Sequence, residues 1–570
     1  MKTTLDFPEM EQEILTLWKN NNTFAVLQAK NKNGKPFRFL DGPITANNPM
    51  GVHHAWGRSL KDIALRYKAM NGYHCHYRNG FDAQGLWVEV EVEKELGFQG
   101  KRDIEAYGMD RFTRKCEERV AKYSAIIADQ SKRLGQWMNW ENSYYTHTDE
   151  NITSIWYFLK TCYENGWLEK SYRPVPWCPR CGTSLSEHEM SGSHQEVTHT
   201  SVFVKLPVRE QDFDILLWTT TPWTLTANVA LAVNPQLVYA LVQLPGAARP
   251  LVLAKTALKY IDGEKQVLRL FPGTELVGLH YETCFPELAV QNFEHRIVAW
   301  DDVAAEEGSG VVHIAPGCGA EDFELGQLLH LPQLCPIDDN GILTAEFAPF
   351  QGLTAAEAAP VIFARLQETG KLLKTMEYTH SYPVCWRCKH EVLFRLVPSW
   401  VIRTDGIRPK LLEAARTVKW EPAYIGKRME DWLQNMGDWN ISRKRYYGLP
   451  LPFYPCEQCG HLTVVGSKAE LRELGGPAVD ELPELHRPWI DSITIICPHC
   501  GAPVQRITEV RGCLVGCRDC AIFYPWLFYE SGRMAALVSG RMGHGNAGAG
   551  TPLVLFPIIY ECHTDRSGTL

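Results

Sequence analysis

The chain has 570 residues, of which 45% are hydrophobic and 22% are charged. This length favours roughly two to four domains, and the composition excludes a mostly disordered or fibrous protein. The formal net charge of −8 excludes a globally basic surface, so any RNA binding must use local patches. No apolar run approaches the roughly 20 residues that span a bilayer, and no signal-peptide pattern is present, so we expect a cytoplasmic protein without membrane contact.

The N-terminal part alternates strand-like and helix-like segments. Residues 36–43 have the pattern of a strand that runs into a loop, residues 54–72 have helical periodicity, and residues 73–85 return to a strand and a loop. A strand, a helix and a strand at this spacing form a βαβ unit with parallel strands. Helical patterns follow over residues 103–135 and 151–166. We therefore predict an α/β fold.

A β-rich region follows between residues 196 and 298. Short apolar runs such as TSVFVKLPV, FDILLWTTT and VYALVQL are separated there by Gly and Pro, which is typical of strands. Helical patterns resume near Arg408. We predict that the β-rich region is a separate inserted domain.

Eight of the 18 cysteines form four Cys-x-x-Cys pairs. A disulfide scaffold is excluded because the chain is far too long and has no export signal. Zinc is the better interpretation, since thiolates at this spacing are typical zinc ligands, and free thiols are the alternative. Two pairs flank the insertion and would form one site, whereas the other two lie within one short segment. The predicted ligands of these two closed structural zinc sites are Cys178, Cys181, Cys385 and Cys388, and Cys456, Cys459, Cys497 and Cys500.

The segment DGPITANNPMGVHHAWGR, residues 41–58, joins the first predicted strand to the first helix. The N-terminus of a helix offers free N–H groups and a partial positive charge, which suit a phosphate. Histidines at such a turn can stabilise charge that develops during phosphoryl displacement. The alternative is a surface loop with incidental histidines.

These residues belong to a set of motifs that resembles isoleucyl-tRNA synthetase, a class I aminoacyl-tRNA synthetase. The set comprises DGPITAN, GVHHAWGRSLKDIALRYKAMNGY, GFDAQGLWVEVEVEKELG, WTTTPWTLTANVALAV, GSGVVHIAPGCGAEDF and WNISRKRYYGLPLP. The resemblance covers roughly residues 5 to 510. Valyl- and leucyl-tRNA synthetases share the architecture, but DGPITAN and WVEVEVEKELG fit the isoleucine enzyme better.

The resemblance implies an ATP site at the start of the first helix. The family signature is His-x-Gly-His, whereas this chain has Gly51, Val52, His53 and His54, so Gly and His are exchanged at two positions. His54 stands where the last histidine of the signature belongs. We therefore expect Gly51, His53 and His54 at the ATP phosphates, with His53 and His54 contributing to catalysis.

The resemblance also implies a site for the amino-acid substrate. Asp82 in GFDAQG matches the family aspartate that holds the α-ammonium group, and the Pro43 carbonyl would bind the same group. The family usually has Trp and His beside this aspartate, where this chain has Phe81 and Gln84. An isolated Asp in a loop is otherwise often a turn former. The expected substrate-binding residues are Gly42, Pro43, Asp82 and Gln84.

A second, hydrolytic site is expected because an isoleucine pocket rejects valine poorly. Isoleucine against valine is the usual example of this limit, and one methylene contributes only about 1–3 kcal/mol. The β-rich insertion resembles the editing domain of the family, although WTTTPWT alone also fits a strand with a β-branched face. By resemblance, Asp322 would bind the α-ammonium of misattached valine, and the threonines and His313 would position water and the terminal adenosine. The expected editing residues are Thr219, Thr220, Thr221, Thr224, His313 and Asp322.

The resemblance implies a class I synthetase fold with a Rossmann-type catalytic core, an inserted β-rich editing domain and two zinc ribbons. The expected activity is ATP-dependent ligation of isoleucine to tRNA(Ile) through isoleucyl-adenylate, with hydrolytic editing of valyl-tRNA. ATP, Mg²⁺ bound with ATP, and Zn²⁺ are the expected cofactors, and a monomer is expected. The predicted divisions are 1–177 for the first half of the catalytic domain, 178–195 for a zinc-ribbon linker, 196–384 for the editing domain, and 385–510 for the zinc ribbons and the return to the catalytic core.

The last 60 residues do not continue the family pattern. They contain no Lys and four of the 18 Cys, and the Lys-rich KMSKS loop and the anticodon-binding domain are not found. Back-translation from Arg511 with a shift of one base can give AAAWLDAGIVPFSTLG, which resembles the family at this point. We therefore predict a frameshift near Arg511, an out-of-frame tail over residues 511–570, and impaired activation of isoleucine.

Two alternative functions stay open from the sequence, one in the same class and one in a different class. Valyl-tRNA synthetase is the same-class alternative, and aminoacyl specificity separates it from the isoleucine enzyme. A zinc-stabilised RNA-binding or trans-editing fragment without ligase activity is the other alternative. Hydrolysis of mischarged tRNA without ATP–pyrophosphate exchange would favour that fragment.

Overall fold

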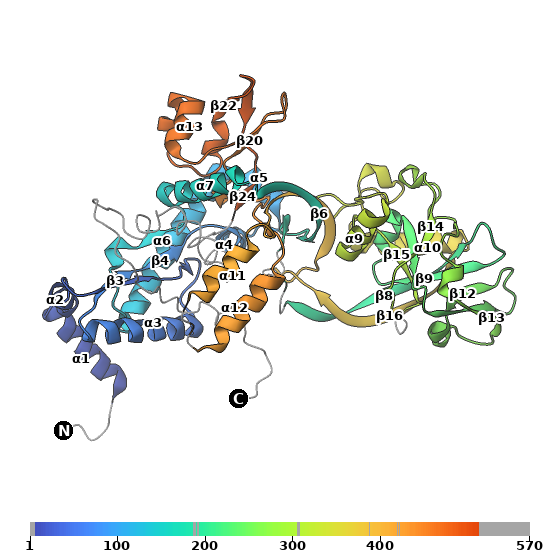
Figure 1. Ribbon diagram of the computed structural model, residues 1–570, viewed down its shortest axis with the longest axis horizontal. Helices are drawn as coiled ribbons and strands as arrows, with labels where there is room; N and C mark the ends of the chain where they lie inside the picture. The colour runs from blue at the N-terminus through green and yellow to red at the C-terminus, as the bar shows by residue number, and fades with distance from the viewer. Residues whose placement is uncertain are drawn as a thin grey trace. The chain divides into compact units, whose positions relative to one another are not determined.

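The computed structural model describes residues 6–185, 190, 193–304, 308–386, 388–418, 420 and 422–511 (Figure 1). The predicted out-of-frame tail lies outside the described residues apart from Arg511. The chain forms two compact units: the first contains residues up to Lys170 and from Trp400 onward, and the second runs from Ser171 to Ser399. The chain leaves the first unit along β6 (Leu168–Cys178) and returns along β17 (Leu393–Ile402).

The first unit contains the predicted βαβ arrangement. Strand β1 (Pro36–Leu40) pairs in parallel with β3 (His74–Arg78), and α3 (Val52–Met70) connects them. The helix begins two residues before the predicted start because Gly51, in extended backbone, caps it. The parallel order continues in a second short sheet, β2-β4-β5, whose strands are β2 (Ile44–Thr45), β4 (Gly80–Asp82) and β5 (Tyr144–Tyr145).

A glycine allows β4 and β5 to approach closely. A Cβ atom at Gly80 would lie 2.1 Å from Cζ of Tyr144, so any side chain there would collide with the ring. The Tyr144 hydroxyl donates to the carbonyl oxygen of Asp41 at 2.6 Å. The same tyrosine therefore links β5 to the loop that follows β1.

Helices surround these strands in the first unit. The helical pattern predicted for residues 103–135 is divided at Gly108, whose φ of +106° ends one helix and begins the next. Helices α11 and α12 pack side by side (Figure 1). Among the described residues, no helix combines the length and the apolar composition needed to cross a membrane. The helices of this unit are α1 (Phe7–Asn20), α2 (Thr23–Lys30), α3, α4 (Leu86–Leu96), α5 (Lys101–Tyr107), α6 (Met109–Arg133), α7 (Asp149–Glu164), α11 (Arg408–Arg416), α12 (Tyr424–Asn435) and α13 (Lys468–Gly475).

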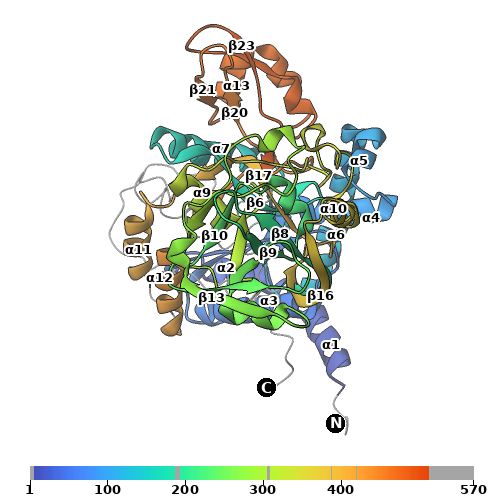
Figure 2. The same ribbon diagram turned by 90° about the vertical axis from the view of Figure 1, so that its right-hand side faces the viewer.

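The C-terminal part of the first unit consists of short antiparallel pairs around α13. Figures 1 and 2 show α13 beside the strands of the cysteine-containing segment. Strand β20 pairs with β21, β22 with β23, and β19 with β24, while β18 pairs with β17. These strands are β18 (Trp439–Asn440), β19 (Leu449–Pro450), β20 (Phe453–Pro455), β21 (Leu462–Val464), β22 (Thr494–Ile496), β23 (Pro503–Gln505) and β24 (Val510–Arg511).

The second unit is built on two sheets, which confirms a β-rich region at this place in the chain. A sheet of order β13-β11-β12-β9-β8-β16 and a sheet of order β14-β10-β15 enclose one apolar core with α10. Strands β8 and β16 form a long antiparallel pair, seen edge to edge in Figure 1. Its elements are β7 (Thr183–Ser184), β8 (His194–Pro207), β9 (Asp214–Thr219), β10 (Ala230–Val233), β11 (Val238–Gln243), β12 (Leu251–Ala254), β13 (Gln266–Pro272), β14 (Arg296–Ala299), β15 (Val311–Ile314), α9 (Ala320–Leu329), α10 (Ala355–Glu368) and β16 (Leu372–Pro383).

Candidate active sites and metal centres

The first candidate site lies at the carboxyl ends of the parallel strands β2, β4 and β5. Asp82 is the last residue of β4, and its half-buried carboxylate accepts hydrogen bonds from two threonines. Thr45 at the end of β2 donates to Oδ2 at 3.2 Å, and Thr146, directly after β5, donates to Oδ1 at 3.3 Å. Ligands of open α/β sheets bind at this edge, so the sheet holds an oriented carboxylate where a cationic group can reach it.

Gln84 is buried and its amide is engaged by the protein. Its Nε2 donates to the carbonyl oxygen of Thr146 at 2.7 Å, and its Oε1 lies 2.9 Å from Nε2 of His486. The predicted substrate-binding residue therefore contacts two partners that sequence reasoning missed. No local pattern points to His486, which lies 402 positions further along the chain.

The corner that carries Gly42 and Pro43 is fixed by a buried ion-pair group. Asp41 is buried, and its carboxylate lies 3.3 Å from a guanidinium nitrogen of Arg58 and 2.9 Å from Nζ of Lys61. Both cations come from α3. Gly42 and Pro43 are half-buried beside this anchor. The ion pairs thus join the predicted substrate corner to the helix whose N-terminus is the predicted phosphate site.

The predicted ATP loop ends at the N-terminus of α3. The N–H of Gly51 donates to Nδ1 of His54 at 3.2 Å, and the rings of His53 and His54 are tilted by 41° with centroids 3.8 Å apart. His53 is exposed and His54 is half-buried. The first N–H groups of α3 have no partner within the helix, so this end can bind an anion.

A second feature that sequence reasoning missed holds the loop before this helix. Arg119 on α6 is buried, and it donates to the carbonyl oxygen of Asn47 at 2.8 Å and to Oδ1 of Asn48 at 3.0 Å. It also pairs with Glu91 and Glu95 of α4. The loop backbone is therefore fixed between two helices.

A buried ion triad fixes the helix that follows the Asp82 loop. Arg445 pairs with Glu89 at 2.5 Å and with Glu93, and all three side chains are at most 2% exposed. Glu89 also accepts the backbone N–H groups of Tyr446 at 3.2 Å and Tyr447 at 2.7 Å. Burial raises the pKa of Glu89, and Arg445 opposes that rise. The triad joins α4 to the chain segment before β19.

The second candidate site brings together three of the four predicted threonines and His313. Thr219 at the end of β9, Thr221 and Thr224 form a chain of hydroxyl contacts at 3.3 and 3.2 Å. Thr224 Oγ1 donates to the Thr221 carbonyl oxygen at 2.7 Å and lies 3.0 Å from Nε2 of His313 on β15. Thr220 is half-buried and adds no hydrogen bond to this network among the described residues.

The threonine network determines the tautomer of His313. Because the Thr224 hydroxyl proton is used on the Thr221 carbonyl, Nε2 of His313 must be the donor in their contact. Nδ1 is then a buried acceptor, and it has no hydrogen-bond partner among the described residues. Burial lowers the pKa of His313 to about 4, so the ring is neutral at physiological pH. The side of His313 that faces the threonines is therefore its Nε2–H.

Asp322 lies in the first turn of α9, the helix that follows β15 and His313 in the sequence. Its Oδ2 accepts the N–H of Ala315, the residue directly after β15, at 2.7 Å. Burial raises the pKa of Asp322 to about 6, and the Ala315 hydrogen bond opposes that rise. A carboxylate so held is ionised at neutral pH and can bind a cation.

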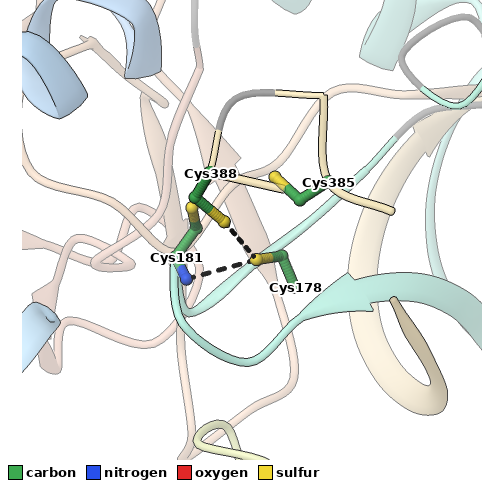
Figure 3. Close-up of side chains that lie close together, drawn as sticks. All are labelled: Cys178, Cys181, Cys385 and Cys388. Atoms are coloured by element: carbon green, nitrogen blue, oxygen red, sulfur yellow. Dashed lines mark hydrogen bonds between the residues drawn. The ribbon is translucent and has the colours of Figure 1, made fainter. Parts of the chain in front are cut away.

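The four cysteines of the first predicted metal site converge. Figure 3 shows Cys178, Cys181, Cys385 and Cys388 from two segments of the second unit pointing toward one another. All four sulfur atoms lie within 4.8 Å of one another, and Sγ of Cys178 is 3.5 Å from Sγ of Cys388. The predicted pairing across the insertion is therefore present.

The second cysteine group has the same geometry. Sγ of Cys456 lies 3.5 Å from that of Cys500, and Sγ of Cys459 lies 3.8 Å from that of Cys497. A tetrahedral zinc with Zn–S bonds of about 2.3 Å places its sulfur ligands about 3.8 Å apart. Both cysteine groups therefore fit zinc, and four thiolates would leave no open coordination position.

All four Cys-x-x-Cys pairs share one turn. The carbonyl of the first cysteine accepts the N–H of the residue four positions later, at 2.7 to 2.9 Å. That residue has φ between +59° and +75° in every pair, and it is Gly182, Lys389, Gly460 or Gly501. Glycine adopts this left-handed backbone without strain, which explains the glycine after three of the four motifs.

Comparison with known proteins identifies the family. The family described as "tRNA synthetases class I (I, L, M and V)" matches residues 13–494. An isoleucine–tRNA ligase of Clostridium novyi (strain NT) is 41% identical over 516 residues, which are 90% of this chain and 49% of that protein. Isoleucine–tRNA ligases of Thermus thermophilus (39%; 89% of this chain, 48% of that protein) and Methanopyrus kandleri (38%; 88% and 49%) are similarly related.

The chain spans about half the length of these relatives. The family match covers the parallel-strand site, the inserted β-rich unit, the first cysteine group and part of the second. The chain belongs to the class I tRNA synthetases of the isoleucine, leucine, methionine and valine group, with an α/β fold.

Proposed function

We propose that this chain carries the isoleucine-activating site and the editing site of an isoleucine–tRNA ligase. The observation that supports the first site most directly is the Asp82 carboxylate, which Thr45 and Thr146 orient at the carboxyl edge of the parallel strands. The relatives named above are isoleucine–tRNA ligases, and their names support isoleucine as the amino-acid substrate. ATP, isoleucine and tRNA(Ile) are the proposed substrates of a monomeric protein.

The proposed reaction relies on positioning rather than on a protein nucleophile. The isoleucine carboxylate attacks the α-phosphorus of ATP, its P–O bond to the leaving group breaks, and pyrophosphate departs with Mg²⁺. Asp82 and the Pro43 carbonyl would hold the α-ammonium, while Gly51, His53 and His54 would face the phosphates. A tRNA ribose hydroxyl then displaces AMP. Fixed hydrogen bonds aimed at developing charge supply the rate enhancement.

Isoleucine binding tests the first site without requiring the complete reaction. Asp82→Asn removes the charge that would pair with the ammonium group. A hydrogen bond to a charged group contributes about 1.5–3 kcal/mol, so we expect binding to weaken about tenfold to hundredfold. Equilibrium dialysis with radiolabelled isoleucine measures this change.

The matched control is Asp129→Asn, which removes an exposed carboxylate from α6 that pairs with Lys132 at the surface. It should bind isoleucine like the wild type. Equal affinity of Asp82→Asn and wild type would show that Asp82 is not the ammonium ligand.

The second site is proposed to hydrolyse valyl-tRNA(Ile). Asp322 would bind the α-ammonium of the misattached valine, and the threonine hydroxyls would hold the terminal ribose. The neutral His313 would hold Thr224 through its Nε2–H and so help to position the attacking water, whose proton passes to the ribose oxygen. Attack on the ester carbonyl then releases valine and leaves the ribose hydroxyl on the tRNA.

The pH dependence of this hydrolysis follows from Asp322. Because its pKa is raised to about 6, the carboxylate is ionised above that pH and neutral below it. The rate of valyl-tRNA hydrolysis, expressed relative to the Asp322→Asn variant, should therefore fall as the pH drops through about 6. His313, with a pKa lowered to about 4, should add no inflection between pH 5 and 8.

Asp302→Asn provides the control, because Asp302 is an exposed carboxylate of the same unit. A ratio of wild-type to Asp322→Asn rates that stays constant from pH 5 to 8 would contradict the ammonium-binding role.

We further propose that both cysteine groups hold Zn²⁺ as structural sites.

A further inference from the structure

A group of three titratable side chains, one buried and two half-buried, contacts Gln84 of the Asp82 loop. It consists of Glu117 on α6, Glu484 and His486. One carboxylate oxygen of each glutamate and one ring nitrogen of the histidine lie within 4.8 Å of one another. His486 is fully buried, and its ring stacks on that of Tyr447 with centroids 5.3 Å apart. Neither the proposed activation chemistry nor the editing chemistry uses these residues.

The hydrogen bonds around His486 have a fixed direction. Gln84 uses Nε2 to donate to the Thr146 carbonyl, so its Oε1 must accept from His486. Nε2 of His486 therefore carries a proton. Nδ1 of the same ring lies 2.9 Å from Oε2 of Glu484, and one proton must lie in that contact as well.

The environment favours a neutral ring and a protonated carboxyl group. Burial lowers the pKa of His486 to about 4, and it raises the pKa of Glu484 and of Glu117. A hydrogen bond between the two carboxyl groups raises the pKa of Glu117 further and opposes the rise in the pKa of Glu484. The other groups that face this cluster are Arg114, which lies 3.1 Å from Glu117 and 3.4 Å from Glu484, and His147, Asp149 and Tyr447. Arg114, the cation that contacts both carboxyl groups, is exposed.

We propose that His486 is a positioning residue for the substrate site, and that the proton held by Glu484 sets its tautomer. The path runs from Glu484 through His486 and Gln84 to Thr146, whose hydroxyl donates to Asp82. This inference rests on the proposed function, because it takes Asp82 as the ligand of the isoleucine ammonium group.

Loss of the Glu484 proton has a defined consequence for Gln84. The carboxylate would then take a hydrogen bond from Nδ1–H, so the neutral ring must give up the proton on Nε2. A bare Nε2 faces Oε1 of Gln84, and the two lone pairs repel. Gln84 must turn its amide over, which removes the bond to Thr146 and loosens the residue that orients Asp82.

The test compares isoleucine binding at pH 5 to 8, where the substrate ammonium stays protonated. Wild-type affinity should fall as the pH rises. Glu484→Gln supplies a permanent N–H to Nδ1, so its affinity should be the same at pH 6 and pH 8. His486→Gln should bind about three- to tenfold more weakly at pH 6, the loss expected for one buried hydrogen bond. His76→Gln changes an exposed histidine on β3 and is the matched control.

A pH profile shared by wild type and Glu484→Gln would overturn the inference while leaving the proposed function intact. So would a His486→Gln affinity equal to that of His76→Gln. If the wild type binds no isoleucine at all, the proposed function fails, and a second measurement then decides the inference.

That measurement is the ¹⁵N spectrum of labelled histidine, with His486 assigned by its absence from His486→Gln. We expect a neutral ring protonated at Nε2 at pH 6 and at Nδ1 at pH 8, with Glu484→Gln keeping the Nε2–H form at both. One unchanged tautomer in the wild type at both pH values, or an imidazolium ring at pH 6, would overturn the inference.

Discussion

Arg445→Met is expected to lower the free energy of unfolding of the first unit by about 3–5 kcal/mol, the cost of breaking a buried ion pair from one side. The substitution keeps the apolar volume but leaves Glu89 and Glu93 as neighbouring buried carboxylates. Glu89 keeps the N–H groups of Tyr446 and Tyr447, which compensate part of the loss at that carboxylate. Urea unfolding of wild type and variant measures the difference.

The deficit should depend on pH. Burial raises the pKa of Glu89 above its ordinary value, and Arg445 is the largest opposing influence. Without Arg445 the folded state binds protons more tightly than the unfolded state, so the variant should lose stability relative to wild type as the pH rises above the ordinary carboxyl range. The deficit is therefore expected to be larger at pH 8 than at pH 5.

Arg416→Met is the matched control for this prediction. Arg416 pairs with Glu430 at 3.1 Å, but its side chain is 58% exposed, and exposed pairs contribute at most about 1 kcal/mol. Replacing the ion pair by two apolar residues, Arg445→Met together with Glu93→Leu, should recover part of the stability that Arg445→Met alone loses. Equal losses for the two arginine variants would show that the triad does not stabilise α4.

Removal of zinc is the second change with a large expected effect. Zinc contributes about 10–16 kcal/mol to the folding of small zinc-finger peptides at neutral pH, because the unfolded chain has no preformed site. Cys459→Ser should therefore lower the zinc content from two ions per chain to one, and β20 to β23 should lose their protection from hydrogen exchange. Elemental analysis and exchange mass spectrometry measure both results.

Cys335→Ser is the control, since Cys335 is a half-buried thiol outside both cysteine groups. It should keep both zinc ions. Wild-type protein that contains no zinc after purification under reducing conditions would contradict the proposed metal sites. So would a Cys459→Ser variant with an unchanged metal content.

The cysteine motifs and the parallel-strand core could be predicted because their signals are local. A Cys-x-x-Cys pair followed by Gly specifies one turn, and the structure shows that turn four times. The strand–helix–strand pattern over residues 36–85 likewise reflects periodicity within a short stretch. The pairing of Cys178 and Cys181 with Cys385 and Cys388 was also predicted, because the two pairs flank the insertion, and the structure brings the four cysteines together.

The groups that support the sites could not be predicted, for two physical reasons. Arg445 and His486 contact α4 and Gln84 across more than 350 positions, and no spacing rule connects them. In addition, VEVEVE over residues 88–93 alternates as a strand would, yet it forms helix α4. All three of its valines and two of its three glutamates are buried, because the acidic face meets Arg445 instead of water.

Gln84 also shows that a residue's role could not be predicted from its position in the sequence alone. Its place beside Asp82 indicates a substrate contact, and the resemblance to the synthetase family reinforces that prediction. The structure shows both amide ends bonded to the protein instead. A residue can therefore stand at a functional position in the sequence and act through its neighbours.

The most direct test of the proposed function is hydrolysis of two aminoacyl esters by the wild-type chain under single-turnover conditions. We expect valyl-tRNA(Ile) to be hydrolysed and isoleucyl-tRNA(Ile) to remain intact, with Asp322→Asn slower than wild type on valyl-tRNA(Ile) and Asp302→Asn equal to wild type. This result would assign the threonine–histidine site to editing by an isoleucine enzyme. Hydrolysis of both esters at equal rates, or of neither, would contradict the account.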